Sequence, residues 1–173
     1  TDVNDTLFFS ANDGWNGYEL WKSNGTLAGT VMLPINPGSG SSSPTSLTDV
    51  NGILFCSATE GINGVELWKS DGTWTGTVMV KNINPGAGNS YPWNLVNVNG
   101  MLFFQANDGT NGYELWKSDG TSGGTVMVKN INPAGDSSPA NLTDFNSTLF
   151  FKATDGTNGY ELWKSDGTSS GTV

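Results

Sequence analysis

One short block of sequence occurs four times in this chain, and its spacing constrains the fold more than any other feature. The block Glu-Leu-Trp-Lys-Ser begins at Glu19, Glu66, Glu114 and Glu161. Successive copies are therefore 47, 48 and 47 residues apart. A unit repeated at this period stacks against its neighbours, because one unit alone cannot bury its own apolar face. We expect one repeat array over residues 1–173, with approximate repeats 1–44, 45–92, 93–139 and 140–173.

The third repeat contains four segments with the pattern of short β-strands. They cover residues 94–98, 101–106, 113–117 and 125–131, and the last of them is rich in β-branched residues. Turns rich in Gly, Asn and Asp separate them. Asn99-Gly100 supplies two residues that tolerate positive φ, as a tight hairpin requires. No segment has the periodicity of a capped helix.

This order of strands and turns predicts an all-β fold made of β-propeller-type blades, each with four antiparallel strands. A β-solenoid is the alternative, but its coils have shorter periods and parallel stacking, whereas these turns specify hairpins. The first and last repeats are incomplete, and the last is truncated before its fourth strand. We expect a segment of a longer array, or an array whose open ends another chain completes, because exposed strand edges associate.

Composition excludes several classes of partner. The chain has seven Lys and Arg against 16 Asp and Glu, no His, and a net charge of -9. Nucleic acid is not an expected partner, because phosphate recognition needs a concentrated basic surface. No apolar run approaches the length needed for membrane insertion. The single cysteine, Cys56, excludes a disulfide within the chain and stands where the other repeats have Phe9, Phe104 and Phe151.

A longer form of the block carries a resemblance to a known family. Glu-Leu-Trp-Lys-Ser-Asp-Gly-Thr occupies residues 66–73, 114–121 and 161–168, and the first copy has Asn24 in place of Asp. With its flanking Leu-Phe-Phe and Gly-Thr-Val segments, the block resembles the signature of the bacterial ELWxxDGT repeat family over essentially the whole chain. The resemblance implies a propeller-like protein that is secreted or attached to the cell surface. It implies no shared activity.

Oxygen-bearing side chains recur at intervals of three residues and form a candidate calcium site in each repeat. The sets are Asp13, Asn16, Glu19; Asp108, Asn111, Glu114; Asp155, Asn158, Glu161; and the variant Glu60, Asn63, Glu66. In the alternative interpretation, which we prefer, Asp and Asn shape the turn and Glu caps neighbouring amides. The Ser-Asp-Gly-Thr turns are likewise similar to Asp-box hairpins, which mostly stabilise the fold.

The tryptophans fall into two groups. Those at one repeat position are interpreted as packing between blades: Trp21, Trp68, Trp116 and Trp163. The aromatic residues that do not recur are candidate ligand-binding residues: Trp15, Trp74, Tyr91 and Trp93. Rings of this kind beside Asn and Asp stack on sugars or contact other proteins. They are equally compatible with surface substitutions that carry no function.

Catalysis is not expected from these residues. There is no His, no Ser or Cys is paired with a base, and the acids recur where a catalytic pair would be unique. Our leading hypothesis is a non-catalytic scaffold, extracellular or on the cell surface, that serves adhesion or assembly. Its partners are other copies of itself or a longer parent chain. The alternatives are a lectin-like carbohydrate-binding propeller, either without a cofactor or with calcium, and a glycan-cleaving enzyme.

Overall fold

The computed structural model describes residues 1–173 as strands and turns, without a helix. The strands form four antiparallel sheets, one for each repeat, which we call blades 1 to 4. Blades 1 and 2 each have four strands: β1 (Asp2–Val3), β2 (Thr6–Asn12), β3 (Tyr18–Ser23) and β4 (Val31–Leu33) in blade 1, and β5 (Thr45–Val50), β6 (Ile53–Ala58), β7 (Glu66–Ser70) and β8 (Val78–Lys81) in blade 2. Blade 3 also has four: β9 (Trp93–Val98), β10 (Met101–Asn107), β11 (Tyr113–Ser118) and β12 (Val126–Lys129). Blade 4 has three: β13 (Ala140–Phe145), β14 (Thr148–Ala153) and β15 (Glu161–Ser165). The predicted all-β fold with propeller-type blades is confirmed.

Each blade is a meander in which every strand pairs with the next one along the chain. The turn between the first two strands of blade 3 has Asn99 at φ 51° and Gly100 at φ 84°. Two consecutive residues with positive φ match the right-handed twist of the flanking strands, which explains the Asn-Gly pair. Blade 4 has three strands, and Val173 extends it by exchanging main-chain hydrogen bonds with Lys164 at 2.9 and 3.0 Å.

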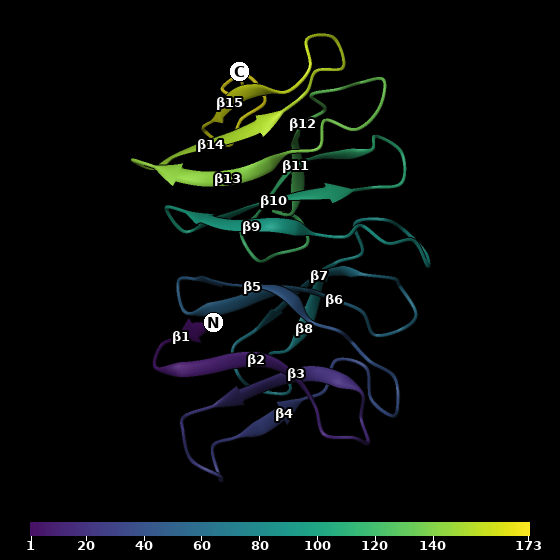
Figure 1. Cartoon of the computed structure of the whole chain (residues 1–173), viewed down its shortest axis with the longest axis vertical. Coiled ribbons are helices and arrows are strands. Elements are labelled where there is room, and N and C mark those ends of the chain that lie inside the picture. The colour runs from purple at the N-terminus through teal and green to yellow at the C-terminus, as the bar shows by residue number, and fades with distance from the viewer.

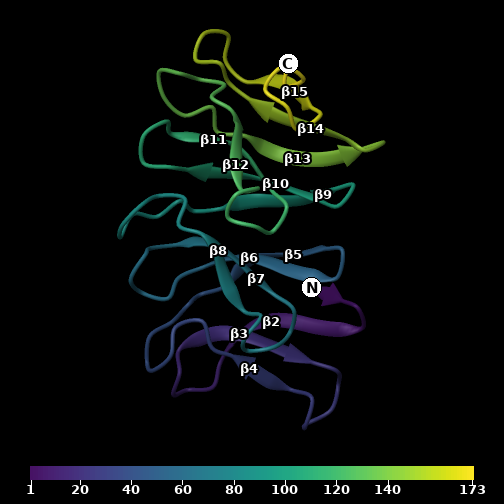
Figure 2. The same cartoon turned by 180° about the vertical axis from the view of Figure 1, so that it is seen from behind.

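The blades stack in sequence order along the longest axis of the molecule. Figure 1 shows blade 1, in purple, and blade 4, in yellow, at opposite ends of the stack, and Figure 2 shows the same order from behind. The first strands of neighbouring blades lie side by side, since β9 contacts both β5 and β13. The array is therefore open, and blades 1 and 4 each have a neighbour on only one side.

The hydrophobic core lies between the blades and is divided into three clusters. Each cluster combines one set of side chains from a blade with a different set from the next blade. In the second cluster, Phe55 and Leu67 of blade 2 meet Phe104 and Trp116 of blade 3. Burying a side chain of this size contributes about 1.5–3 kcal/mol. Trp68 and Trp116 are buried members of these clusters and Trp163 packs against the third, which confirms the predicted role between blades for these three. Trp21 of blade 1, the first blade of the stack, belongs to none of the clusters.

Cys56 is a buried residue of the first cluster and takes the place of the phenylalanine found there in blades 3 and 4. Burial raises the pKa of its thiol to about 12. Cys56 therefore behaves as a small apolar side chain, as its position in the repeat predicted.

None of the chain forms a helix with the length and apolar character needed to cross a membrane.

Candidate functional site

The repeated glutamate of each block is buried and ties one blade to the segment that leads to the next. Glu114 is the second residue of β11, and its side chain is fully buried. Its carboxylate accepts hydrogen bonds from the Ile131 amide at 2.8 Å and from the Ser137 hydroxyl at 2.7 Å. Burial raises the pKa of Glu114, against the opposing effect of these donors. The donors satisfy a buried charge, so the glutamate is a structural anchor for the crossing segment.

The same anchor occurs in blades 1 and 2. Glu19 accepts from Ile35 and Ser42, and Glu66 accepts from Ile83 and Ser90. Burial likewise raises the pKa of Glu66. Glu161 of blade 4 has the same sequence around it but is exposed. The structure contains no crossing segment beyond blade 4 that would cover it.

The Asp and Asn of the predicted calcium sets serve a different network from the glutamates. Asp108 accepts from the amides of Thr110 and Asn111 at 2.9 and 2.8 Å and from the Asn111 side chain at 2.7 Å. Asp13 with Asn16, and Asp155 with Asn158, form the same turn. Glu60 takes the place of Asp in blade 2 and accepts from Asn63. These hydrogen bonds are those expected of the turn interpretation.

The oxygen atoms available for a metal are few. No group of three or more His, Cys, Asp and Glu side chains is placed to hold a metal ion. The buried side-chain oxygens that accept no hydrogen bond belong to Glu60, Asn82 and Asn130. Calcium takes six to eight oxygen ligands, so these residues alone fall short of a complete set. Calcium binding stays a prediction.

The Ser-Asp-Gly-Thr turns are held by hydrogen bonds within one blade. Asp119 accepts from the Thr121 hydroxyl at 2.7 Å and from its amide at 2.8 Å. These two donors hold the pKa of the exposed Asp119 carboxyl below its usual value. Asn24 makes the same two contacts in blade 1, at 2.7 and 3.1 Å. An uncharged amide therefore also supports the turn, which indicates a structural role.

A cleft with the same lining recurs between each pair of consecutive blades. Between blades 2 and 3 it is lined by Phe55 and Lys69 from one side and by Asp119 and Gly120 from the other. Lys69 Nζ donates to the Gly120 carbonyl at 2.8 Å. Lys117 donates to Gly167 at the same distance between blades 3 and 4. The cleft is thus a feature of the blade interface and occurs three times.

The four non-recurring aromatic residues are all exposed, but they do not form one surface. Trp15 lies in the β2–β3 turn and Trp74 in the β7–β8 turn, which are at opposite ends of the blade strands. Tyr91 and Trp93 lie two residues apart where the chain enters β9, and 49% and 53% of their surfaces are exposed. Of the four, these two are the ones that the chain holds close together.

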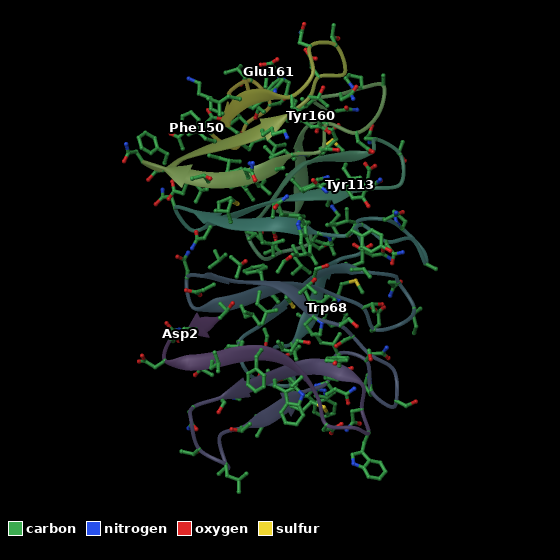
Figure 3. All side chains as sticks on the ribbon, viewed as in Figure 1. Asp2, Trp68, Tyr113, Phe150, Tyr160 and Glu161 are labelled. Carbon is green, nitrogen blue, oxygen red and sulfur yellow. The ribbon has the colours of Figure 1, made fainter.

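Tyr91 is unusual in its backbone as well as in its exposure. It has φ 45°, a left-handed conformation that is rare for a bulky side chain. Ser43 and Ser138 occupy the equivalent positions with φ 46°. Burial, then the nearby Tyr91 and Asp136, raises the pKa of Tyr113. The Tyr113 amide also donates to the Asp136 carboxylate at 2.7 Å. Sequence reasoning missed this pair because its two residues come from different segments. Figure 3 labels Tyr113 near the blade edge.

The chain resembles known structures in its fold. No protein-family model and no curated protein matches it. A solved structure of a puromycin hydrolase mutant superposes with a TM-score of 0.63 and 19% identity, over 93% of this chain and 25% of that one. This likeness shows the β-propeller-like fold alone. An exo-β-1,3-galactanase structure from Bifidobacterium bifidum aligns over 96% of this chain and 65% of that one at 9% identity, with a TM-score of 0.43. The chain spans about a quarter of the length of the puromycin hydrolase structure, and the shared feature is a row of propeller-like blades.

Proposed function

We propose that this protein is a non-catalytic repeat scaffold, extracellular or on the cell surface, whose blades serve assembly or adhesion. The observation that carries the proposal is the repetition of one interface. The same lysine, glycine and glutamate contacts occur at successive blade junctions, so the recurrent acids already have a structural task. The resemblance to the ELWxxDGT repeats motivates the location outside the cell.

The clefts favour this proposal over a glycan-cleaving enzyme. A glycosidase needs a pair of carboxyl groups with different environments at one place. Each cleft instead presents one aspartate beside one lysine, and the lining repeats from junction to junction. A repeated surface suits multivalent contact better than a single reaction centre.

The assembly part of the proposal is tested by measuring the mass of the purified chain. Light scattering across a 1,000-fold range of concentration, roughly 0.1 μM to 100 μM, covers the affinities of ordinary protein contacts. We expect the average mass to rise with concentration. A mass that stays at the 18.2 kDa of one chain throughout would contradict self-assembly.

Carbohydrate binding is the second candidate, and one observation favours it. Tyr91 and Trp93 are exposed together, and Tyr91 holds a backbone conformation that costs free energy for its residue type. A glycan array, with and without a chelator, tests the idea. A Tyr91→Ser variant is the matched comparison, because it removes the ring and keeps the backbone. Serine occupies the equivalent position, at nearly the same φ, between blades 1 and 2 (Ser43) and between blades 3 and 4 (Ser138). No binding by the native chain under either condition would contradict the lectin hypothesis.

A further inference from the structure

Every junction between blades joins two different surfaces. We call the forward face of a blade the surface toward the next blade and the rear face the surface toward the previous one. The forward faces carry the sets Val3, Phe8, Leu20; Val50, Phe55, Leu67; and Val98, Phe103, Leu115. The rear faces carry the sets Leu54, Cys56, Trp68; Leu102, Phe104, Trp116; and Leu149, Phe151, Trp163. Because the two faces differ, the contact has a direction.

One face of each kind is left uncovered at the ends of the stack. On the rear face of blade 1, Leu7 is 51% exposed, whereas its equivalents Leu54, Leu102 and Leu149 are 0% exposed. On the forward face of blade 4, Leu162 is 76% exposed, whereas Leu20, Leu67 and Leu115 are 0% exposed. Phe145 of the same face is 62% exposed. The open ends are thus the two complementary halves of one apolar junction.

The polar and close-packed contacts of the junction are also split between the two ends. Inside the stack, a phenylalanine ring and a lysine of one blade contact the turn glycine of the next: Phe55 and Lys69 at Gly120, Phe103 and Lys117 at Gly167. On blade 4, the equivalent Phe150 and Lys164 have no such glycine to contact. On blade 1, the equivalent Gly25 is exposed, with open space where a Cβ would lie. Figure 3 labels Phe150 on blade 4.

Charge at the two ends is complementary. A hollow on the rear face of blade 1 is lined by Asp2, Asp5, Leu7 and Gly25. In the internal junctions, an aspartate of the rear face and a lysine of the preceding blade line the same cleft, as Asp119 and Lys69 do. Blade 1 has Asn24 at that position, but Asp2 and Asp5 supply negative charge in the same hollow. Lys164 of blade 4 is the matching cation.

We propose that the forward face of blade 4 docks on the rear face of blade 1 of a second copy of this chain. Leu162 and Phe145 then pack beside Leu7, and Lys164 donates to the Gly25 carbonyl. This inference rests on the proposed assembly function and specifies the surfaces that perform it. Because the two faces are different, repeated docking runs head to tail and gives a closed ring or an open fibre.

Two substitutions and their mixture test the docking. Leu162→Asp places a charge in the forward face, and Leu7→Asp places one in the rear face. Both side chains are exposed in the single chain, so circular dichroism should report an unchanged fold. Ile62→Asp is the matched control, because Ile62 is 74% exposed in the β6–β7 turn, away from both faces.

Sedimentation velocity gives the readout. We expect each variant alone to lose affinity for itself by about 100-fold or more, the effect of removing a central apolar contact. Each variant keeps one intact face of opposite kind, so an equal mixture should form a dimer with one native contact. The control should assemble as the native chain does. These three results together support head-to-tail docking.

The contrary results distinguish a failure of the docking model from a failure of the proposed assembly function. If the native chain assembles and either variant alone assembles equally well, the docking surfaces are wrong while assembly stands. If both variants are monomeric and their mixture is also monomeric, the contact is not head to tail. If the native chain is monomeric at every concentration, both the docking and the assembly function are overturned.

Discussion

Blades 3 and 4 contain one identical stretch of sequence in two different environments. Residues 113–121 and residues 160–168 both read Tyr-Glu-Leu-Trp-Lys-Ser-Asp-Gly-Thr. In blade 3, Glu114 and Leu115 are fully buried, whereas in blade 4 the equivalent Glu161 is exposed and Leu162 is 76% exposed. The strand and its exit turn form in both blades. The block therefore encodes a blade and one half of a junction, and the next repeat supplies the other half.

The largest expected difference between the two blades concerns the leucine. Leu115→Ala should lower the free energy of unfolding by about 2–5 kcal/mol, because it leaves a cavity in the core between blades. Leu162→Ala should change it by less than about 0.5 kcal/mol, since the side chain is mostly in solvent. Urea denaturation at a concentration where the chain is monomeric measures both. If the two substitutions lowered the free energy of unfolding equally, the neighbouring blade would not be the cause of the difference in burial between Leu115 and Leu162.

The glutamates should give the next largest difference. Glu114→Ala leaves the buried donors of Ile131 and Ser137 without their acceptor, which costs about 1–3 kcal/mol. Glu161→Ala removes an exposed carboxylate and should be close to neutral. The crossing segment at residues 132–139 should also exchange its amide hydrogens faster in the first variant only. A neutral Glu114→Ala variant would contradict the anchoring role.

The turn aspartates should behave alike in the two blades, because their hydrogen bonds lie within one blade. The Thr121 hydroxyl and amide lower the pKa of Asp119, and Thr168 does the same for Asp166. A carboxylate with a lowered folded-state pKa stabilises the fold above its unfolded value, 3.8, and that contribution is lost as pH falls.

Asp119→Asn and Asp166→Asn should therefore each flatten, by a similar small amount, the loss of stability below about pH 4. Asn24 shows that the turn accepts an amide without losing its hydrogen bonds. Thermal unfolding between pH 2.5 and pH 7 gives the comparison. A variant whose acid sensitivity equals that of the native chain would argue against a role for that carboxylate.

Calcium removal should have the smallest effect in either blade. The carboxylates of Asp108 and Glu114 already accept hydrogen bonds from the chain itself, in two separate networks. We expect the melting temperature to be the same in a chelator and in millimolar Ca²⁺. A calcium-dependent rise in the native chain that is absent from an Asp108→Asn variant would support the calcium site instead.

Much of the fold follows from local sequence rules. The Asn99-Gly100 pair predicts a hairpin because both of its residues tolerate positive φ, and the recurring tryptophans predict packing between sheets. The partners of Glu114 do not follow from local rules. They lie 17 to 23 residues later in the chain, and only the geometry of the crossing brings them back.

The candidate binding residues were less predictable for the same reason. Trp15 and Trp74 look alike in the sequence as exposed rings in turns, but the meander sends their turns to opposite ends of the strands. The Tyr113 amide donates to the Asp136 carboxylate although the two residues lie 23 positions apart in the chain. The exposure of Leu162 depends on whether another blade stands beside it, which the residues of blade 4 alone do not determine.

Extending the chain by one repeat tests most directly that each block is half of a junction. Val173 is equivalent to Val78, so residues 79–126 of this sequence, appended after Val173, would supply a fourth strand, a crossing and a further blade. In that extended protein, Leu162→Ala should cost about 2–5 kcal/mol of unfolding free energy, as a buried leucine does. If the substitution stays as neutral there as in the 173-residue chain, the added repeat has not completed the junction and the account is contradicted.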